Sequence, residues 1–315
     1  MKESIPTLIT LDVHSYPETE KDVPLWLDET MKLFDELSIK ATFFFPAVVI
    51  EKFSGYACRI SKAGHEIGCH GLEHGPEEQY HLMQYSSQKS ILREAKSRIE
   101  DVLSKEVVSF RSPAFKISGD TIRALEESGF KIESSVNPQR LGIFSSDVGN
   151  VGWMYSPRKP YHPSYKNPFR KGQSKIWEVP LSSFILPFMS NTGMAFGRSF
   201  MKLFLRLLLA ESMLSRGQIV YMLHPEDIYP KRDRLRYRFR WGHLLPSRMH
   251  GFEIRQILFN NKCPEAILSQ NISLLKTMEA SKNSKIMLLS EMPAYLENKS
   301  KKREPLCVEY AEKLA

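Results

Sequence analysis

The 315-residue chain contains few cysteines and no long apolar run. Its four cysteines form no C-x-x-C pair, so the sequence indicates neither a cysteine-ligated zinc motif nor a thioredoxin-like redox motif. The most apolar stretch, residues 200–209, is broken by Lys202 and Arg206 and is shorter than the ~20 residues that span a bilayer. The first residues also lack the charged and then apolar pattern of a secretory signal. We therefore expect a cytoplasmic protein that does not cross a membrane.

Acidic residues are scarce in two stretches that are rich in lysine and arginine. Residues 148–177 contain six Lys or Arg and no acid, and residues 231–250 contain seven against Asp233 alone. In residues 232–241 arginines alternate with mostly apolar residues, so an extended segment would carry the guanidinium groups on one face. No nucleic-acid-binding motif accompanies this charge, and we expect no nucleic acid partner.

Two interpretations of the basic stretches stay open. In the first, residues 231–250 form a solvated hairpin whose apolar face packs on the protein. In the second, the basic residues attract an anionic substrate, such as a sugar carried on a phospholipid or polyprenyl phosphate. The protein would then make peripheral contact with the inner face of an anionic membrane, with a leucine-rich helix at residues 200–214 nearby.

The order of helical and strand patterns predicts an α/β fold. Apolar spacing predicts helices at residues 22–37, 86–104, 118–128, 200–214 and 264–278, and short apolar runs predict strands at residues 8–13, 41–45, 107–110, 130–135, 176–184, 219–223 and 285–289. Strands that alternate with helices in this way form a parallel sheet with helices outside, as in a barrel. We expect one domain over residues 1–297, with irregular insertions near residues 136–175 and 231–262, and a frayed tail at residues 298–315.

Polar residues stand at the ends of four apolar runs. They are Asp12 with His14, His70 with His74, Arg111, and His224. Because functional groups gather at the C-terminal ends of the strands in parallel barrels, we expect these side chains to converge. His70 and His74 are four residues apart, a spacing that brings two imidazoles to one metal ion on a helical turn or where a strand runs into a helix.

Five motifs in order make the chain resemble the polysaccharide deacetylase family, the NodB-homology carbohydrate esterases. The motifs are Thr10-Leu11-Asp12, Lys40-Ala41-Thr42-Phe43-Phe44, the run from Gly64 to His74, Arg111-Ser112-Pro113, and Leu223-His224. They cover about residues 5–230. The resemblance implies a distorted TIM-like (β/α)7 barrel, and a metal-dependent hydrolase that removes an acetyl or formyl group from the amide nitrogen of a sugar or sugar conjugate.

The resemblance also implies roles for individual residues. Asp12 would be the catalytic base, with the opposite charge of Arg111 keeping it ionised. His224 would be the acid that protonates the leaving amine. The backbone N–H of Ala114 would assist in stabilising the oxyanion. Ala114 itself departs from the family, in which an aromatic residue usually follows the R-x-P motif, and this leaves the substrate open.

The expected metal site departs from the family at Val13. Many members carry a second aspartate there as a metal ligand, and valine cannot bind a metal. His14 stands two positions after Asp12, on the same face of the strand, so we expect His14, His70 and His74 as ligands. Three imidazoles suit Zn²⁺ and are also accepted by Fe²⁺, Co²⁺ and Ni²⁺. The alternatives are that Asp12 binds the metal directly or that the site holds little metal.

Two other functions remain open beside a deacetylase. One is a deformylase or small-amide hydrolase of the same barrel type. The other is a catalytically silent carbohydrate-binding or anion-binding protein that kept the barrel after losing the aspartate at position 13.

Overall fold

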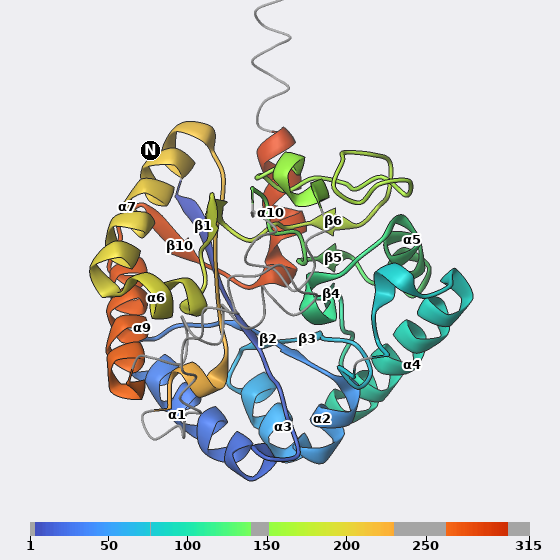
Figure 1. Ribbon diagram of the computed structural model, residues 1–315, viewed down its shortest axis with the longest axis horizontal. Helices are drawn as coiled ribbons and strands as arrows, with labels where there is room; N and C mark the ends of the chain where they lie inside the picture. Colours follow the sequence, from blue (N-terminus) through green and yellow to red (C-terminus); the bar gives the residue numbers. More distant parts are fainter. Residues whose placement is uncertain (1–3, 76, 140–150, 230–262, 302–315) are drawn as a thin grey trace, which may run out of the picture.

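The computed structural model describes residues 4–75, 77–139, 151–229 and 263–301. Seven parallel strands form a curled sheet in the order β9-β1-β2-β3-β4-β5-β6, with helices around the outside (Figure 1). The strands are β1 Ile5–Asp12, β2 Thr42–Phe45, β3 Glu66–Cys69, β4 Ser109–Phe110, β5 Ile132–Glu133, β6 Trp177–Glu178 and β9 Ile219–Leu223. The predicted α/β class and distorted (β/α)7 barrel are confirmed.

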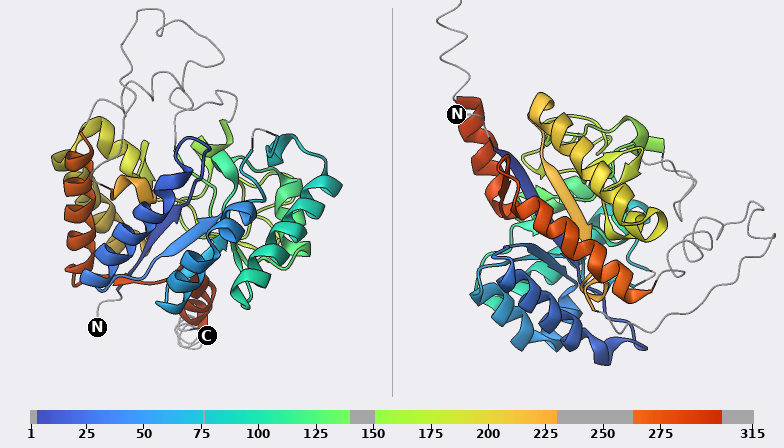
Figure 2. Two further views of the ribbon diagram at one scale, coloured as in Figure 1. Left: turned by 90° about the horizontal axis from the view of Figure 1, so that it is seen from below. Right: turned by 90° about the vertical axis from the view of Figure 1, so that its left-hand side faces the viewer.

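The barrel is distorted where β6 and β9 come closest. The segment after β6 joins the two strands: Ser182 N–H donates to the carbonyl of Val220 over 3.3 Å, and Met189 forms an isolated bridge with Met222. An eighth strand, β10 (Ser284–Ile286), pairs with the first residues of β1. Figure 2 shows the following helix, α10 (Met292–Lys301), at this same end of the barrel.

The helices follow the predicted pattern, with α2, α3, α6 and α10 as additions. Their bounds are α1 Val23–Glu36, α2 Ala47–Lys52, α3 Ser54–Lys62, α4 Tyr85–Leu103, α5 Gly119–Glu127, α6 Ser190–Phe196, α7 Arg198–Ser215 and α9 Pro264–Glu279. Helices α2, α3 and α6 were not predicted, because segments of six, nine and seven residues are too short to show a clear helical period. Ser118 caps α5 as expected, with its hydroxyl accepting from Thr121 N–H. No described helix is long and apolar enough to cross a membrane.

Side chains alternate between the two faces of β1, so every second residue faces the interior of the barrel. Leu8 packs inside the barrel with Phe44 and Val220, whereas Ile9 and Leu11 pack in the layer between sheet and helices. Residues two apart on a strand share a face, so Asp12 lies on the same interior face as Leu8. The same parity places His224 in line with Val220 on β9.

Four sequence expectations need correction or limits. The predicted strand at residues 176–184 is split into β6 and a hairpin of β7 (Ser183–Phe184) and β8 (Leu186–Pro187). The described part of the insertion near residues 136–175 packs on the barrel through buried Trp153 and Tyr161. Helix α10 runs to Lys301, so residues 298–301 are helical rather than frayed. The stretch at residues 231–250 lies outside the described residues.

Candidate active site

Three histidines lie together at the C-terminal ends of the barrel strands. His14 follows β1, His70 follows β3, and His74 lies in the loop beyond it. Each offers one ring nitrogen, and these three atoms lie within 4.8 Å of one another. The ring centroids of His14 and His74 are 4.5 Å apart, and those of His70 and His74 are 4.9 Å apart. The structure therefore brings together the three residues that were predicted to bind a metal.

Hydrogen bonding and burial prepare His70 to act as a ligand. Its Nδ1 lies 2.7 Å from the carbonyl oxygen of Arg111, which can only accept, so Nδ1 carries the proton. The other nitrogen, Nε2, is then a lone-pair donor that faces the cluster. Burial lowers the pKa of His70 to about 3, and burial also lowers the pKa of His74. Neutral imidazoles with this arrangement fit Zn²⁺, Fe²⁺, Co²⁺ or Ni²⁺.

The loop from Gly71 to His74 corrects the expectation that the two histidines lie on a helical turn or where a strand runs into a helix. Gly71 has φ +85° and His74 has φ +60°, so the chain turns sharply twice after β3. A Cβ at Gly71 would lie 2.3 Å from Oε1 of Glu78, which explains the glycine at this position. The strand end, without a following helix, brings the pair together.

Glu78 holds this loop in place and was missed by the sequence analysis. Its side chain is buried, and its carboxylate accepts hydrogen bonds from four donors: Leu72 N–H at 2.7 Å, Glu73 N–H at 2.9 Å, His74 N–H at 2.7 Å and Tyr80 O–H at 2.5 Å. An acid four residues after His74 is the only sequence signal of this role. The role itself depends on a loop conformation that no periodic pattern encodes.

Asp12 is held by a buried network centred on Arg111. Arg111 Nη1 donates to Asp12 Oδ1 over 2.8 Å and to Thr10 Oγ1 over 2.9 Å. Its other nitrogens donate to the carbonyl and hydroxyl oxygens of Ser134, over 2.8 and 3.0 Å. Arg111 is completely buried, and the network fixes its guanidinium on all sides.

The charge of Asp12 is kept by its neighbours against the effect of burial. Burial alone would raise the pKa of this carboxyl, but the charges of Arg111, His70 and His224 outweigh it, and the pKa is lowered. Oδ2 of Asp12 lies 3.9 Å from Nε2 of His70, too far for a direct hydrogen bond. The ionised carboxylate of Asp12 thus lies beside the histidine cluster. In this position it could act as a general base or as a further metal ligand.

His224 approaches the cluster from β9. Its ring centroid lies 4.9 Å from that of His14. Oδ2 of Asp227 accepts from the backbone N–H of His224 over 3.0 Å and lies 3.4 Å from its Nδ1, and Ser190 O–H donates to the same oxygen. Asn271 Nδ2 donates to the backbone carbonyl of Asp227 over 3.0 Å.

The surroundings of His224 favour its protonated form. Burial lowers the pKa of His224, but the hydrogen bond to Asp227 and the charges of Glu226, Asp227 and Asp12 raise it by more. The resulting pKa is about 9. At neutral pH this imidazolium can donate a proton. Asp227 was not predicted, although an acid three residues after the histidine is a signal of such a pair.

Ala114 lies in a tight turn after the buried Arg111. It is exposed and has φ +54°, and Phe115 has φ +61°. The backbone N–H groups of Phe115 and Lys116 donate to the carbonyls of Ser112 and Pro113 within the turn. The oxyanion role of Ala114 stays a prediction.

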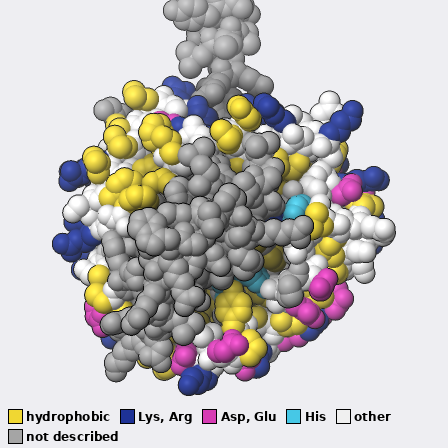
Figure 3. Space-filling view, in the orientation of Figure 1, with side chains coloured by type: hydrophobic (Ala, Val, Ile, Leu, Met, Phe, Trp, Pro, Cys, Tyr) yellow, Lys and Arg dark blue, Asp and Glu magenta, His cyan; other side chains and the backbone are white. Residues whose placement is uncertain are grey.

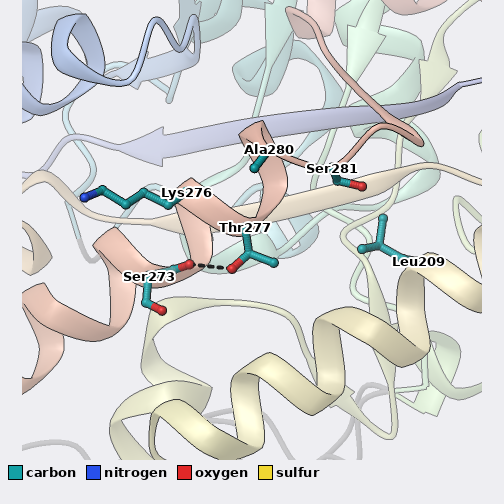
Figure 4. Close-up of a pocket in the computed structure, with 6 residues that line it drawn as sticks. All are labelled: Leu209, Ser273, Lys276, Thr277, Ala280 and Ser281. Carbon is teal, nitrogen blue, oxygen red and sulfur yellow. Dashed lines mark hydrogen bonds between the residues drawn. The ribbon is translucent and has the colours of Figure 1, made fainter.

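A second hollow lies away from this cluster, between α7 and α9 (Figure 4). It has a volume of about 520 Å³ and is lined by Leu209, Ser273, Lys276, Thr277, Ala280 and Ser281. The hydroxyl of Thr277 donates to the carbonyl of Ser273. This lining contains neither a histidine nor a carboxylate, so the hollow offers no general base for hydrolysis.

The sequence model of the polysaccharide deacetylase family matches residues 8–132, which include the three histidines, Asp12 and Arg111. Residues 8–132 are thus similar to the polysaccharide deacetylase family. The chain also has curated relatives. A peptidoglycan deacetylase of Helicobacter pylori is 32% identical over 156 residues, 49% of this chain and 52% of that protein. A peptidoglycan deacetylase-like protein of Gibberella zeae is 31% identical over 121 residues, 38% of this chain and 35% of that protein. The match thus spans about half or less of these relatives.

Solved structures support the fold of the chain over nearly its whole length. A Mycobacterium smegmatis protein described as a candidate polysaccharide deacetylase superposes with a TM-score of 0.63 at 15% identity, covering 95% of this chain and 92% of that one. A Puue allantoinase superposes with a TM-score of 0.56 at 13% identity, covering 92% and 89%. At these identities the likeness shows the barrel alone.

Proposed function

We propose that the protein is a metal-dependent hydrolase that removes an acetyl or formyl group from the amide nitrogen of a sugar or sugar conjugate. The observation that carries the proposal is the cluster of His14, His70 and His74 beside a carboxylate and a protonated imidazole. Amide hydrolysis needs a base for the attacking water and an acid for the leaving amine. Asp12 and His224 supply these two groups from the ends of the adjacent strands β1 and β9.

Each residue of the site has a separate role in this reaction. A divalent metal, most suitably Zn²⁺, would be held by the three histidines, and when bound it would polarise the carbonyl and acidify a water molecule. Asp12 accepts the proton of the attacking water. Arg111 keeps that carboxylate ionised and fixes its orientation through the 2.8 Å hydrogen bond. His224, held by Asp227, donates a proton to the departing amine.

The family supports an N-acetylated amino sugar as the substrate. One curated relative is named a peptidoglycan deacetylase and the other a peptidoglycan deacetylase-like protein, and these names support an N-acetylated glycan as the substrate class here. A cytoplasmic location and a lipid-linked anionic sugar stay predictions from the sequence. The first was expected from the cysteines and the N-terminal residues, and the second from the basic stretches at residues 148–177 and 231–250, of which the latter lies outside the described residues.

The position of Val13 bears on the alternative of a silent relative. Val13 is buried in the layer between sheet and helices, so it cannot contribute a ligand. His14 nevertheless reaches the cluster with His70 and His74, and the donor set is complete without an acid at position 13. This arrangement favours a working enzyme over a binding protein that lost its metal.

The test is to purify the protein without chelators, to measure bound metal, and to follow acetate and formate release from N-acetylated glycan oligosaccharides. His70→Ala and His74→Ala should each lose metal and hydrolysis while keeping the circular dichroism spectrum. His162→Ala is a matched control, because the ring of His162 packs at a tilt against Trp177 outside the cluster. Metal retained by both cluster variants would refute the ligand assignment, and formate release without acetate release would favour the deformylase.

A further inference from the structure

Helix α7 carries leucines on the side that faces away from the barrel. Its inner face packs Met201, Phe204, Leu205 and Leu208 into the core. On the outer face Leu203 is 56% exposed, Leu207 is 53% exposed and Leu214 is 88% exposed. These three residues follow one another at helical spacing and lie along one stripe. The outer face of a surface helix is normally polar, so this stripe needs a partner or a function.

The β7–β8 hairpin extends this stripe. Arg158 joins the hairpin to α7, because its guanidinium donates to the carbonyl of Ser183 over 2.6 Å and pairs with Glu211 of α7. At the hairpin tip Phe184 is 53% exposed and Ile185 is 56% exposed. We call Phe184, Ile185, Leu203, Leu207 and Leu214 the apolar patch. Figure 3 shows apolar side chains gathered in the upper left of the view, over α7.

The backbone of the hairpin tip is strained, and no burial of the Ile185 side chain offsets this strain. Ile185 has φ +65°, a conformation that glycine or asparagine adopts readily and that is a genuine outlier for a β-branched residue. Its side chain is exposed, so the strain gains no burial. A strained, exposed isoleucine next to an exposed phenylalanine is expected where the side chains contact something outside the protein.

A row of cations lies beside the leucines on α7. Arg198, Lys202 and Arg206 are spaced four residues apart and therefore share one edge of the helix. The only acid on α7 is Glu211, and it is paired with Arg158. The helix thus presents an apolar stripe bordered by positive charge.

We propose that the apolar patch and this basic edge dock the protein on an anionic lipid surface. An amphipathic helix with leucines on one side and Lys or Arg beside them lies in the plane of a membrane interface, with the cations at the headgroups. A second copy of the chain fits less well, because a two-fold contact pairs α7 with itself, and the one acid of α7, Glu211, is already paired with Arg158 and offers the cations no partner. Figure 3 shows histidine side chains on the same face as the patch, so docking would bring the lipid surface to this face of the barrel.

The proposal does not rest on hydrolysis, and vesicle flotation of the full-length protein tests it. Vesicles of phosphatidylcholine with phosphatidylglycerol should bind the parent, and pure phosphatidylcholine vesicles should bind it weakly. A patch variant with Leu203→Ser, Leu207→Ser and Leu214→Ser should lose at least about tenfold in binding. An edge variant with Lys202→Ser and Arg206→Ser should bind more weakly and with less dependence on salt. All variants retain the basic residues at 231–250, so a loss of vesicle binding in a variant is caused by the change in α7.

Two controls make the result specific. Leu82→Ser changes a leucine that is 72% exposed on another part of the surface, and it should bind vesicles like the parent. His70→Ala should also bind like the parent, which separates docking from the metal site. Equal binding of the parent and the patch variant, or no binding by the parent, would overturn the proposal. So would a stable dimer of the parent that the patch variant dissociates, since that result assigns the patch to a second copy.

Discussion

Asp12 Oδ1 accepts a hydrogen bond from Arg111 Nη1 over 2.8 Å, and neither side chain is more than 3% exposed. A buried pair of this kind adds little net stability, because both charges lose their hydration. Breaking it is expensive, because one charge is then left buried without compensation. The pair therefore fixes the position and the ionised state of Asp12. Substitution of Arg111 is expected to destabilise the protein, because it leaves the buried carboxylate unpaired.

The first prediction concerns Arg111→Met. Loss of the guanidinium should destabilise the protein by about 3–5 kcal/mol, measured by urea unfolding. It should also let burial raise the pKa of Asp12, so that kcat/KM at pH 7 falls and its acidic limb moves to higher pH. The double variant Asp12→Asn with Arg111→Met should be more stable than Arg111→Met alone. A single variant as stable as the parent would contradict this account.

The sequence predicted much of the site because the family motifs and simple strand geometry agree. Alternation along β1 places Asp12 inside the barrel, and a parallel sheet brings the ends of β1, β3, β4 and β9 to one face. These two facts are enough to predict from the sequence that His14, His70, Arg111 and His224 lie together. His70 and His74 were predicted to lie close together on a helical turn or where a strand runs into a helix; they do lie close together, but at a strand end that is followed by a loop.

The supporting residues could not be predicted in the same way. Glu78 reaches three backbone N–H groups only because the chain adopts positive φ at Gly71 and His74. Asp227 reaches His224 only through the short 3₁₀ turn that follows β9. Both roles depend on irregular backbone, which neither periodicity nor composition encodes.

The second prediction concerns His14, the ligand that replaces the usual acid. His14→Ala should lose most of the metal affinity, because one of the three nitrogens within 4.8 Å is removed. His14→Asp should keep metal and part of the activity, because a carboxylate at this position is still a ligand for Zn²⁺. Isothermal titration with Zn²⁺ and Co²⁺ measures both variants. If His14→Ala binds metal as tightly as the parent, the third ligand lies elsewhere, and Asp12 is the first residue to test.

The third prediction concerns pH and His65, which lies apart from the cluster. His65 is 4% exposed, its Nδ1 accepts from the N–H of Ala41 over 3.1 Å, and its ring packs against Phe34 and Phe43. Burial, with a contribution from Lys40, lowers its pKa to about 4. The unfolded chain takes up this proton near pH 6.5, so the folded state loses stability as pH falls from about 6.5 toward 4.

Removing the titration should flatten this dependence. Between pH 7.5 and pH 5 the parent should lose about 2 kcal/mol more than His65→Gln, from the shift of one histidine. Urea unfolding at the two pH values measures the difference. Other buried groups, such as Glu66, titrate in both proteins and cancel in the comparison. Parallel pH profiles for the two proteins would show that His65 does not control this loss.

The last prediction concerns Glu78, which positions a ligand without touching the metal. Its carboxylate accepts from the backbone N–H of His74 over 2.7 Å and from the two preceding residues. Glu78→Gln replaces one accepting oxygen with an amide that donates, so the loop should lose part of its hold on His74. Metal affinity should fall by about 10–100-fold, as for other residues that orient a metal ligand.

A Co²⁺ absorption spectrum separates this role from general destabilisation. In Glu78→Gln the band shape of the Co²⁺-loaded site should change, because His74 is no longer held in one orientation. A loss of stability alone would lower the occupancy of the site without altering the band shape. Glu78→Asp should recover part of the affinity, since it restores the carboxylate on a shorter side chain. Glu77→Gln is the matched control, because Glu77 is exposed one position earlier and should leave both affinity and spectrum unchanged. Equal metal affinity in Glu78→Gln and the parent would show that the loop holds His74 without this carboxylate.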